Sequence, residues 1–481
     1  MFPFYFNNKE LQDIENWDTS KLQKKFIALE NVSALAHACV EFPLFTICPP
    51  AFEDPLTWGS LTKDYSIPLD IREEMFNEGF HPLSRELYEQ KTYFKEPFEE
   101  ICKDLGSHVI VDCNYGLFFY EFNGHFLRYG LDQAMFNRYR DLLPRNIPFK
   151  GQDVLDVGAM RGQLATGDRK NSTSEIVEYT VTSRPELLRI INKINNTSRS
   201  SSIKLWFRGQ PNDYKLKDFN SAKYRTHLPY RNITDSSLVP SLFRLKSLSQ
   251  QNYKQYYKEI IETQIYIEAL TNHLEIKDYI IRNKDENEEF NFFNSTAWGL
   301  YNSGMTSTHV DQDGNEVYKK DTYPGFFALQ KSFFLQHYGL PSPILDITHS
   351  LDVALFFAQN KIIDNQYQRV SRTERPVLYL MLLDEKVDLF MASSNICRDH
   401  KLLRPLRQEC GFIAGASILN RNYYSRFISV KIYLDAFIEY SPSITPDYLF
   451  PSEEEDPFLK KLNDTKHKFD LNNIFPFELK R

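Results

Sequence analysis

Five apolar runs, each about the length of one buried strand, constrain the fold of the C-terminal part of this chain more than any other feature. Their β-branched and aromatic side chains suit a sheet. The runs are 203–209, 343–348, 375–383, 411–419 and 426–434; a shorter strand is predicted at 177–183 and an amphipathic helix at 184–194. Because helices fall between the strands without regular βαβ alternation, the sequence predicts an α+β fold.

Two helices flank the run at 343–348. The first, 326–338, is followed by Gly339 and Pro341, which typically stop a helix. The second, 350–359, has Ser350 as its expected N-cap and a small apolar stripe on one face. A longer helical segment is predicted over 251–283, before a polar insert at 284–323.

The chain has 481 residues, which is too long for one ordinary core, so we expect two domains. Residues 1–164 form a smaller N-terminal α+β unit, with a regulatory or target-binding role and a hairpin at Asn123-Gly124. Residues 165–174 form a polar linker and 175–440 the main domain. The tail, 441–481, is expected to pack on the body.

The composition excludes several classes of function. The formal charge of −7 gives no overall attraction to nucleic acid or anionic lipid. We find no apolar stretch long enough to span a bilayer and no secretion signal. The six cysteines form no C-x-x-C pair, which disfavours metal and disulfide sites. A cytoplasmic protein without membrane partners is expected.

Two short motifs favour structural interpretations. The segment 154–163, VLDVGAMRGQ, is similar to the glycine loop of cofactor-binding methyltransferases, but it lacks a further glycine and an extended βαβ sequence. We interpret it as a strand and turn. The segment 311–316, DQDGNE, resembles the start of a calcium loop without its terminal glutamate, and is interpreted as a hairpin turn.

Arg208 stands against the apolar character of its own strand, after Trp206 and Phe207. A half-buried guanidinium needs planar acceptors, either a carboxylate such as Asp346 or a bound phosphate. Residues 160–250 carry 16 Lys and Arg against 7 Asp and Glu. This local excess favours a phosphate-bearing ligand, although a structural pair with Asp346 stays open.

Two other blocks concentrate polar residues near predicted strand ends. Residues 335–358 bring together His337, Tyr338, Asp346, Thr348 and His349. They form either a well-capped turn or one wall of a ligand pocket. The segment 404–415 places Gln408 and Glu409 just before an apolar strand, where they either point into a cleft or belong to a solvated loop.

In order, these blocks resemble the FRG domain family, named for the triplet that stands here as Phe207-Arg208-Gly209. LWFRGQ is followed by LVPSLFR, an acidic-aromatic helix, LQHYGLPSPILDITHSLDVALFFA and RQECGF. The likeness covers roughly 175–440. Ser342 and Ile347 stand where the family usually has Thr and Trp.

The family pattern is similar to that of ADP-ribosyltransferases, which implies a split mixed sheet with helices and NAD as the substrate. The implied NAD-binding residues are Arg208, Gly209, Gln210, His337, Tyr338 and Asp346, and the implied catalytic residues are Thr348, Gln408 and Glu409. By this resemblance Arg208 would hold the pyrophosphate or ribose, and Tyr338 or Thr348 would flank the nicotinamide. Gln408 or Glu409 would orient the ribose and stabilise an oxocarbenium-like transition state.

The expected function is therefore ADP-ribosyl transfer to a macromolecule, protein or nucleic acid, or hydrolysis of NAD, in a bacterial or phage-related toxin or defence system. The alternative is a module without catalysis that binds a nucleotide or a phosphorylated partner through the Arg208 pocket. A carboxylate or amide at 408–409 that faces Arg208 across a cleft is required by the first interpretation only.

Overall fold

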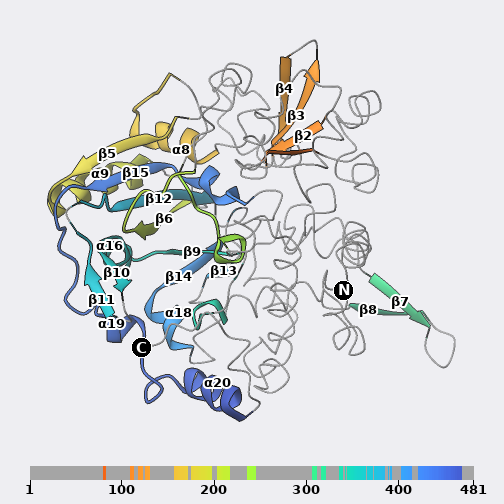
Figure 1. Cartoon of the computed structure of the whole chain (residues 1–481), viewed down its shortest axis with the longest axis vertical. Helices are drawn as coiled ribbons and strands as arrows, with labels where there is room; N and C mark the ends of the chain where they lie inside the picture. The colour runs from red at the N-terminus through yellow and green to blue at the C-terminus, as the bar shows by residue number, and fades with distance from the viewer. Residues whose placement is uncertain are drawn as a thin grey trace.

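The fold centres on one mixed sheet (Figure 1). The computed structural model describes residues 80–82, 109–112, 117–122, 125–130, 157–171, 175–197, 203–216, 236–244, 306–310, 316–320, 335–339, 342, 344–363, 366–371, 373–384, 388, 391–392, 402–413 and 421–468. The predicted helical segment 251–283 lies outside these residues, as does most of the predicted N-terminal unit.

Seven strands form this sheet, in the order β13-β14-β9-β6-β12-β15-β5. Each neighbouring pair is antiparallel except β15 and β5, which are parallel. The strands are β5 (Val177–Val181), β6 (Ile203–Gln210), β9 (Leu345–Thr348), β12 (Val377–Asp384), β13 (Met391–Ala392), β14 (Cys410–Ile413) and β15 (Val430–Leu434). The α+β prediction is confirmed, and each of the five apolar runs contributes a strand.

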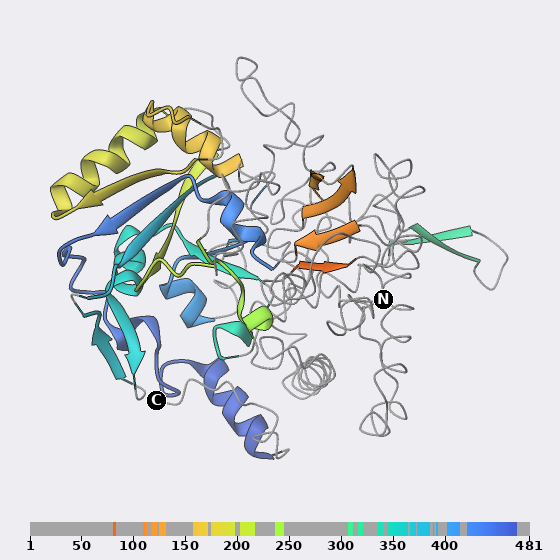
Figure 2. The same ribbon diagram turned by 45° about the horizontal axis from the view of Figure 1, so that its top comes forward.

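One face of the sheet packs on helices α9 (Arg184–Thr197) and α16 (Leu351–Gln359). Figure 2 shows α9 running along the β5 edge. Leu378 and Leu380 of β12 and Phe207 of β6 lie in the resulting core. Gly209 allows α16 to approach, because a Cβ atom there would lie 1.9 Å from the carbonyl oxygen of Ala354.

Ser350 caps α16 by accepting a hydrogen bond from the amide of Val353, as the sequence predicts. At 335–339, helical residues give way to a turn that ends at Gly339, whose φ of 105° is a backbone conformation that suits glycine. The predicted helix stop is therefore confirmed. Together these two ends position the strand β9 between them.

The opposite face of the sheet carries a buried polar cluster around Asp213. Its carboxylate accepts hydrogen bonds from the hydroxyls of Tyr379 and Tyr433, each 2.7 Å long, and Lys431 lies 3.4 Å away. Burial alone would raise the pKa of Asp213, but Lys431 and the other donors hold it well below the usual range. Tyr379 is the cross-strand partner of Arg208, so the cluster fixes the strand next to this arginine.

Helix α8 (Val157–Thr166) packs against α9 and against the η10 turn (Tyr423–Phe427). The predicted strand and turn over 154–163 is wrong for residues 157–163, which are helical. Gly158 and Gly162 face the chain at 427–429, and a Cβ atom on Gly162 would lie 1.8 Å from the carbonyl oxygen of Ser429. Residues 157–164, which the sequence interpretation assigns to the N-terminal unit, thus pack with the main sheet.

Two predicted hairpins are confirmed outside this sheet. The Asn-Gly turn joins β3 to β4, with Phe122 paired to His125, and DQDGNE joins β7 to β8, with Val310 paired to Glu316. The first hairpin belongs to a four-stranded antiparallel sheet. The strands of this sheet are β1 (Phe80–Pro82), β2 (Val109–Asp112), β3 (Leu117–Phe122) and β4 (His125–Gly130). The second hairpin is a separate two-stranded sheet of β7 (Thr306–Val310) and β8 (Glu316–Lys320).

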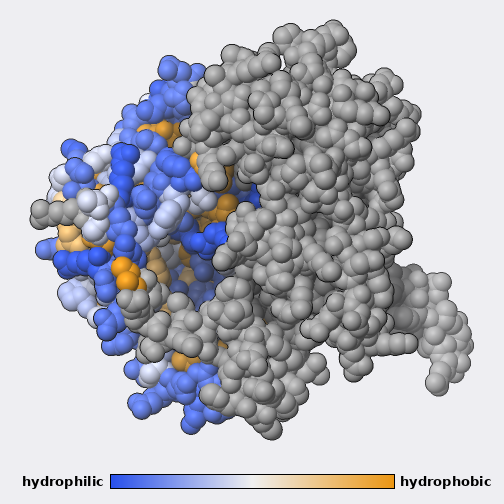
Figure 3. All heavy atoms as spheres, viewed as in Figure 1, coloured by the Kyte–Doolittle hydropathy of each residue, from blue (hydrophilic) through white to orange (hydrophobic). Residues whose placement is uncertain are grey.

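The C-terminal segment, residues 441–468, contributes side chains to the core beside α16. Leu449 and Phe450 are buried against Val353 and Phe356. The remaining elements are η8 (Ser241–Arg244), β10 (Asn360–Ile363), β11 (Gln366–Arg369), α18 (Leu403–Arg407), α19 (Pro446–Leu449) and α20 (Pro457–Lys468). On the face in Figure 3, the coloured residues are mainly hydrophilic with scattered apolar side chains, which is ordinary for a protein surface.

Candidate functional site

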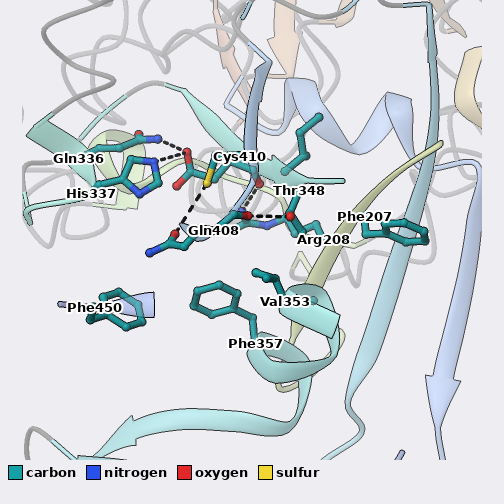
Figure 4. Close-up of a pocket in the computed structure, with 13 residues that line it drawn as sticks. Phe207, Arg208, Gln336, His337, Thr348, Val353, Phe357, Gln408, Cys410 and Phe450 are labelled. Carbon is teal, nitrogen blue, oxygen red and sulfur yellow. Dashed lines mark hydrogen bonds and ion pairs between the residues drawn. The ribbon is translucent and has the colours of Figure 1, made fainter. Parts of the chain in front are cut away.

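A cavity of about 220 Å³ lies where strands β6 and β9 part (Figure 4). The two strands pair at one position, Phe207 with Thr348. Arg208 and Gly209, the next two residues of β6, do not pair with β9, and both line the cavity. Six of the nine predicted site residues line this cavity: Arg208, Gly209, His337, Asp346, Thr348 and Gln408.

Arg208 reaches across the opening from β6 to β9. Its Nη1 donates a 2.6 Å hydrogen bond to the backbone carbonyl oxygen of Asp346. Burial lowers the pKa of Arg208, and the nearby Asp346 carboxylate opposes this shift. Its Nε is buried and has no hydrogen-bond partner among the described residues. Arg208 therefore keeps a buried donor that a ligand could use.

Asp346 presents its carboxylate to the same cavity. The side-chain amide of Gln336 donates to it, and Nε2 of His337 lies 3.7 Å away. Burial raises the pKa of Asp346, while His337 and Arg208 favour the charged form. Burial lowers the pKa of His337, which favours the neutral imidazole. The Asp346 side chain is 36% exposed, so a ligand could reach it.

Thr348 and Gln408 line the cavity, but the fold also uses their polar groups. Oγ1 of Thr348 donates to the carbonyl oxygen of Gln408 over 2.7 Å and accepts from the amide of Ser350. Nε2 of Gln408 donates to the carbonyl oxygen of Leu449 over 3.1 Å. The contacts of Thr348 match its capped-turn interpretation. Gln408 is buried and lines the cavity, so it does not belong to a solvated loop.

The other three predicted residues do not line the cavity. The hydroxyl of Tyr338 is buried and donates a 2.7 Å hydrogen bond to Asp456. Glu409 is exposed and has a φ of 48°, which is unusual for a residue with a side chain. Gln210 lies at the end of β6, and its Oε1 is buried without a hydrogen-bond partner in the described part of the chain.

Sequence reasoning missed an aromatic wall and a second arginine. Val353 and Phe357 of α16 and Phe450 of the C-terminal segment line the cavity. The apolar stripe of α16 indicated only a core face, and no pattern marked Phe450. Arg244, the last residue of the LVPSLFR block, lies close enough to lower the pKa of Arg208, after the larger effect of burial. The signal for Arg244 was present in that block.

Neither a metal-binding cluster nor a membrane-spanning helix is found in the described ranges. These residues contain no group of three or more His, Cys, Asp or Glu side chains that could hold a metal ion. The same ranges contain no helix that is both long and apolar enough to cross a membrane.

Comparison with known proteins gives one family. The model of the FRG domain matches residues 203–366, which begin at β6 and include β9 and α16. No curated protein and no solved structure matches the chain. The matched region contains Arg208, His337, Asp346 and Thr348, while Gln408 lies beyond it. The resemblance predicted from the sequence is confirmed for residues 203–366, which match the FRG domain.

Proposed function

We propose that the cavity binds the nicotinamide ribosyl part of NAD and that the domain breaks the bond between the ribose and the nicotinamide. The observation that carries this proposal is the placement of Arg208 and Asp346. They come from two diverging strands, β6 and β9, and line one cavity. A guanidinium and a carboxylate facing one small space can position a ribose and stabilise positive charge on it.

The reaction needs no covalent intermediate with the protein. The bond between C1′ of the ribose and the ring nitrogen breaks, and its electron pair goes to the nicotinamide. Water or an acceptor group then adds to C1′ and releases a proton. The carboxylate of Asp346 would stabilise the cationic sugar, and the cationic substrate ring would in turn favour the ionised form of Asp346. Arg208 would hold the ribose through the donor that the fold leaves available.

The predicted residues take more limited roles in this proposal. Thr348 and Gln408 position β9 and α18 around the cavity, because their side chains bond to backbone groups. A catalytic role of Glu409 stays a prediction that the side-chain position does not favour. An ADP-ribosyltransferase-like split of the sheet is also part of the proposal, supported by the single residue pair that joins β6 to β9.

The acceptor would be a protein, a nucleic acid or water, and the N-terminal region would regulate the reaction or select the target. A role in a toxin or phage-defence system would follow from such an activity, because loss of NAD or modification of an essential macromolecule stops growth. The second candidate function is nucleotide or phosphate binding without catalysis. It is favoured by the use of Thr348 and Gln408 in the fold and by the position of Glu409 outside the cavity.

Nicotinamide release from NAD tests the proposal, with Asp346→Asn as the central variant. The substitution keeps the shape of the side chain and removes its charge, and we expect a loss of about 100-fold or more in rate. Asp352→Asn is the control, since Asp352 pairs with Arg184 on α9 and lies outside the cavity.

Release by wild-type protein and Asp352→Asn but not by Asp346→Asn supports the proposal. Nucleotide binding without any release, with candidate acceptors present, supports the second function. Equal release by all three proteins would show that the carboxylate of Asp346 does not stabilise the transition state.

A further inference from the structure

The cavity has two chemically different sides (Figure 4). Gln336 and His337 form a polar side together with Asp346, which contacts both of them. Val353, Phe357 and Phe450 form an apolar and aromatic side. Arg208 and Thr348 lie between them. A ligand that satisfies both sides needs a planar apolar group joined directly to a polar group.

The aromatic side is held in place by contacts within the fold. The ring of Phe450 stacks on Tyr367 with centroids 5.3 Å apart, and meets Phe357 edge to face at 6.1 Å. The residue before Phe450 is held by the hydrogen bond from Gln408 to the carbonyl oxygen of Leu449. Phe450 is only 9% exposed. Such fixed aromatic rings lose little conformational freedom when they bind a planar group.

The charges of the cavity disfavour a diphosphate inside it. Among the lining residues described, Arg208 carries the one positive charge and Asp346 the one carboxylate, while the lowered pKa of His337 favours its neutral form. Arg244 lies near Arg208 but does not line the cavity. The volume of about 220 Å³ is also smaller than the roughly 300–1,000 Å³ of most small-molecule sites. The cavity therefore suits one half of a dinucleotide, and the phosphates would lie outside it.

We propose that Phe357 and Phe450 form the subsite for the heteroaromatic ring of the ligand, and that this ring is the nicotinamide rather than the adenine. The proposal rests on the function proposed above. The nicotinamide ring of NAD is cationic, and aromatic faces and a nearby carboxylate both attract a cationic ring. Adenine is neutral and gains neither attraction. The ribose of the same half then reaches Arg208 and Asp346.

This assignment gives a role to a residue beyond the family match. Phe450 belongs to the C-terminal segment, whereas the FRG match ends at residue 366. Phe450 would therefore set the ring specificity of this particular chain on a site whose polar side comes mainly from the matched region.

Binding of two halves of NAD, nicotinamide mononucleotide and ADP-ribose, tests the subsite by calorimetry on the full chain. We compare wild-type protein with Phe450→Leu, which removes the ring but keeps an apolar side chain, and Phe450→Tyr, which keeps the ring. Tyr448→Ala is the matched control, since Tyr448 lies on α19 in the same segment, is exposed, and is outside the cavity. Thermal unfolding of each variant shows that it is folded.

We expect Phe450→Leu to weaken the binding of nicotinamide mononucleotide by about tenfold, because the stacking is lost, and to leave the affinity for ADP-ribose unchanged. Phe450→Tyr should bind nicotinamide mononucleotide more tightly than Phe450→Leu does, and Tyr448→Ala should bind both probes like wild type. Phe357→Leu should repeat the Phe450→Leu result, which guards against a folding defect in one variant.

Each other outcome overturns the inference, and three of them can be distinguished. If NAD binds to the wild type and nicotinamide mononucleotide is unaffected by Phe450→Leu, the ring subsite is wrong while the proposed function stands. If ADP-ribose alone is weakened, the adenine half occupies the site. If neither NAD nor either probe binds to the wild type, the proposed function fails and the subsite fails with it.

Discussion

The three residues of the triplet Phe207-Arg208-Gly209 have different roles in the structure. Phe207 lies in the core beneath α16, and Gly209 leaves room for the backbone of that helix. Arg208 points to the opening between β6 and β9 and bonds to the backbone of Asp346. The sequence leaves open whether a carboxylate or a bound ligand accepts the hydrogen bonds of the Arg208 guanidinium. The hydrogen bond to a carbonyl oxygen and the unbonded Nε favour the ligand.

Glu409 provides a test of catalysis that does not depend on lost stability. Its φ of 48° is unfavourable for a residue with a Cβ atom, so Glu409→Gly should stabilise the protein by about 0.5–1 kcal/mol. Since Glu409 lies outside the cavity, nicotinamide release should not change. Urea unfolding and the release assay on the same preparation check both statements. A loss of release in a stabilised variant would restore Glu409 as a catalytic residue.

His349 predicts a pH dependence of stability. Burial, and secondarily Lys204, lower the pKa of His349 to about 4, from an ordinary value near 6.5. The unfolded chain therefore takes up this proton first, so stability present above about pH 6.5 is lost as the pH falls toward about 4. His349→Phe keeps a ring against Trp206 and removes the titration.

The measurement is the difference in urea midpoint between wild type and His349→Phe across this pH range. The difference cancels the opposite contribution of Asp346 and Asp456, whose pKa values burial raises. A difference that does not change with pH would contradict the assignment.

At the residue scale, sequence could predict which polar groups gather but not how they are satisfied. Arg208, Asp346 and Thr348 could be placed together because their blocks end on strands of one expected sheet. The partners of Thr348 and Gln408 are carbonyl oxygens at 408 and 449, which only the folded chain brings near. Phe450 belongs to a segment for which the sequence predicted packing alone, so its ring could not be assigned to the cavity.

At the scale of elements, helix α8 shows why one prediction was wrong. Almost every described side chain between Val157 and Thr166 is buried, so the segment has no polar face and no helical periodicity to detect. Its glycines then favoured a turn. The strands and α16 were predictable because apolar runs and an amphipathic pattern persist in them.

The glycines of α8 predict a specific packing defect. Gly162→Ala would force a Cβ atom into the backbone at Ser429, and we expect a loss of about 1–3 kcal/mol in unfolding free energy, or more. Gly167→Asn is the control: Gly167 has a φ of 71° with no atom within 4 Å of a built Cβ, and Asn tolerates this conformation. Urea unfolding measures both variants. Equal stability of Gly162→Ala and wild type would contradict the close approach.

For the whole molecule, the sheet extends well beyond the family match. Strand β12 lies between β6 and β15, yet both β12 and β15 follow residue 366. Helix α8 precedes the match and contacts β12 and β15. The folding unit should therefore include at least residues 157–468, whereas 203–366 alone lacks the strand that pairs with the full length of β6.

Expression of two fragments tests this unit. Residues 157–468 should unfold cooperatively, and 203–366 should show no cooperative transition, because its sheet would lose the centre of the apolar core. Circular dichroism during heating distinguishes the two. A cooperative transition in the shorter fragment would show that β12 and β15 are not required.

The central claim, that Arg208 serves a ligand rather than the fold, is tested most directly by NAD binding to Arg208→Met. Methionine keeps an apolar stem of similar length and removes the charge. Burial disfavours this charge, as the lowered pKa of Arg208 indicates, and the buried Nε has no hydrogen-bond partner among the described residues. We predict that the variant still unfolds cooperatively in urea and that it loses NAD binding by calorimetry. Unchanged NAD binding in this folded variant would contradict the claim.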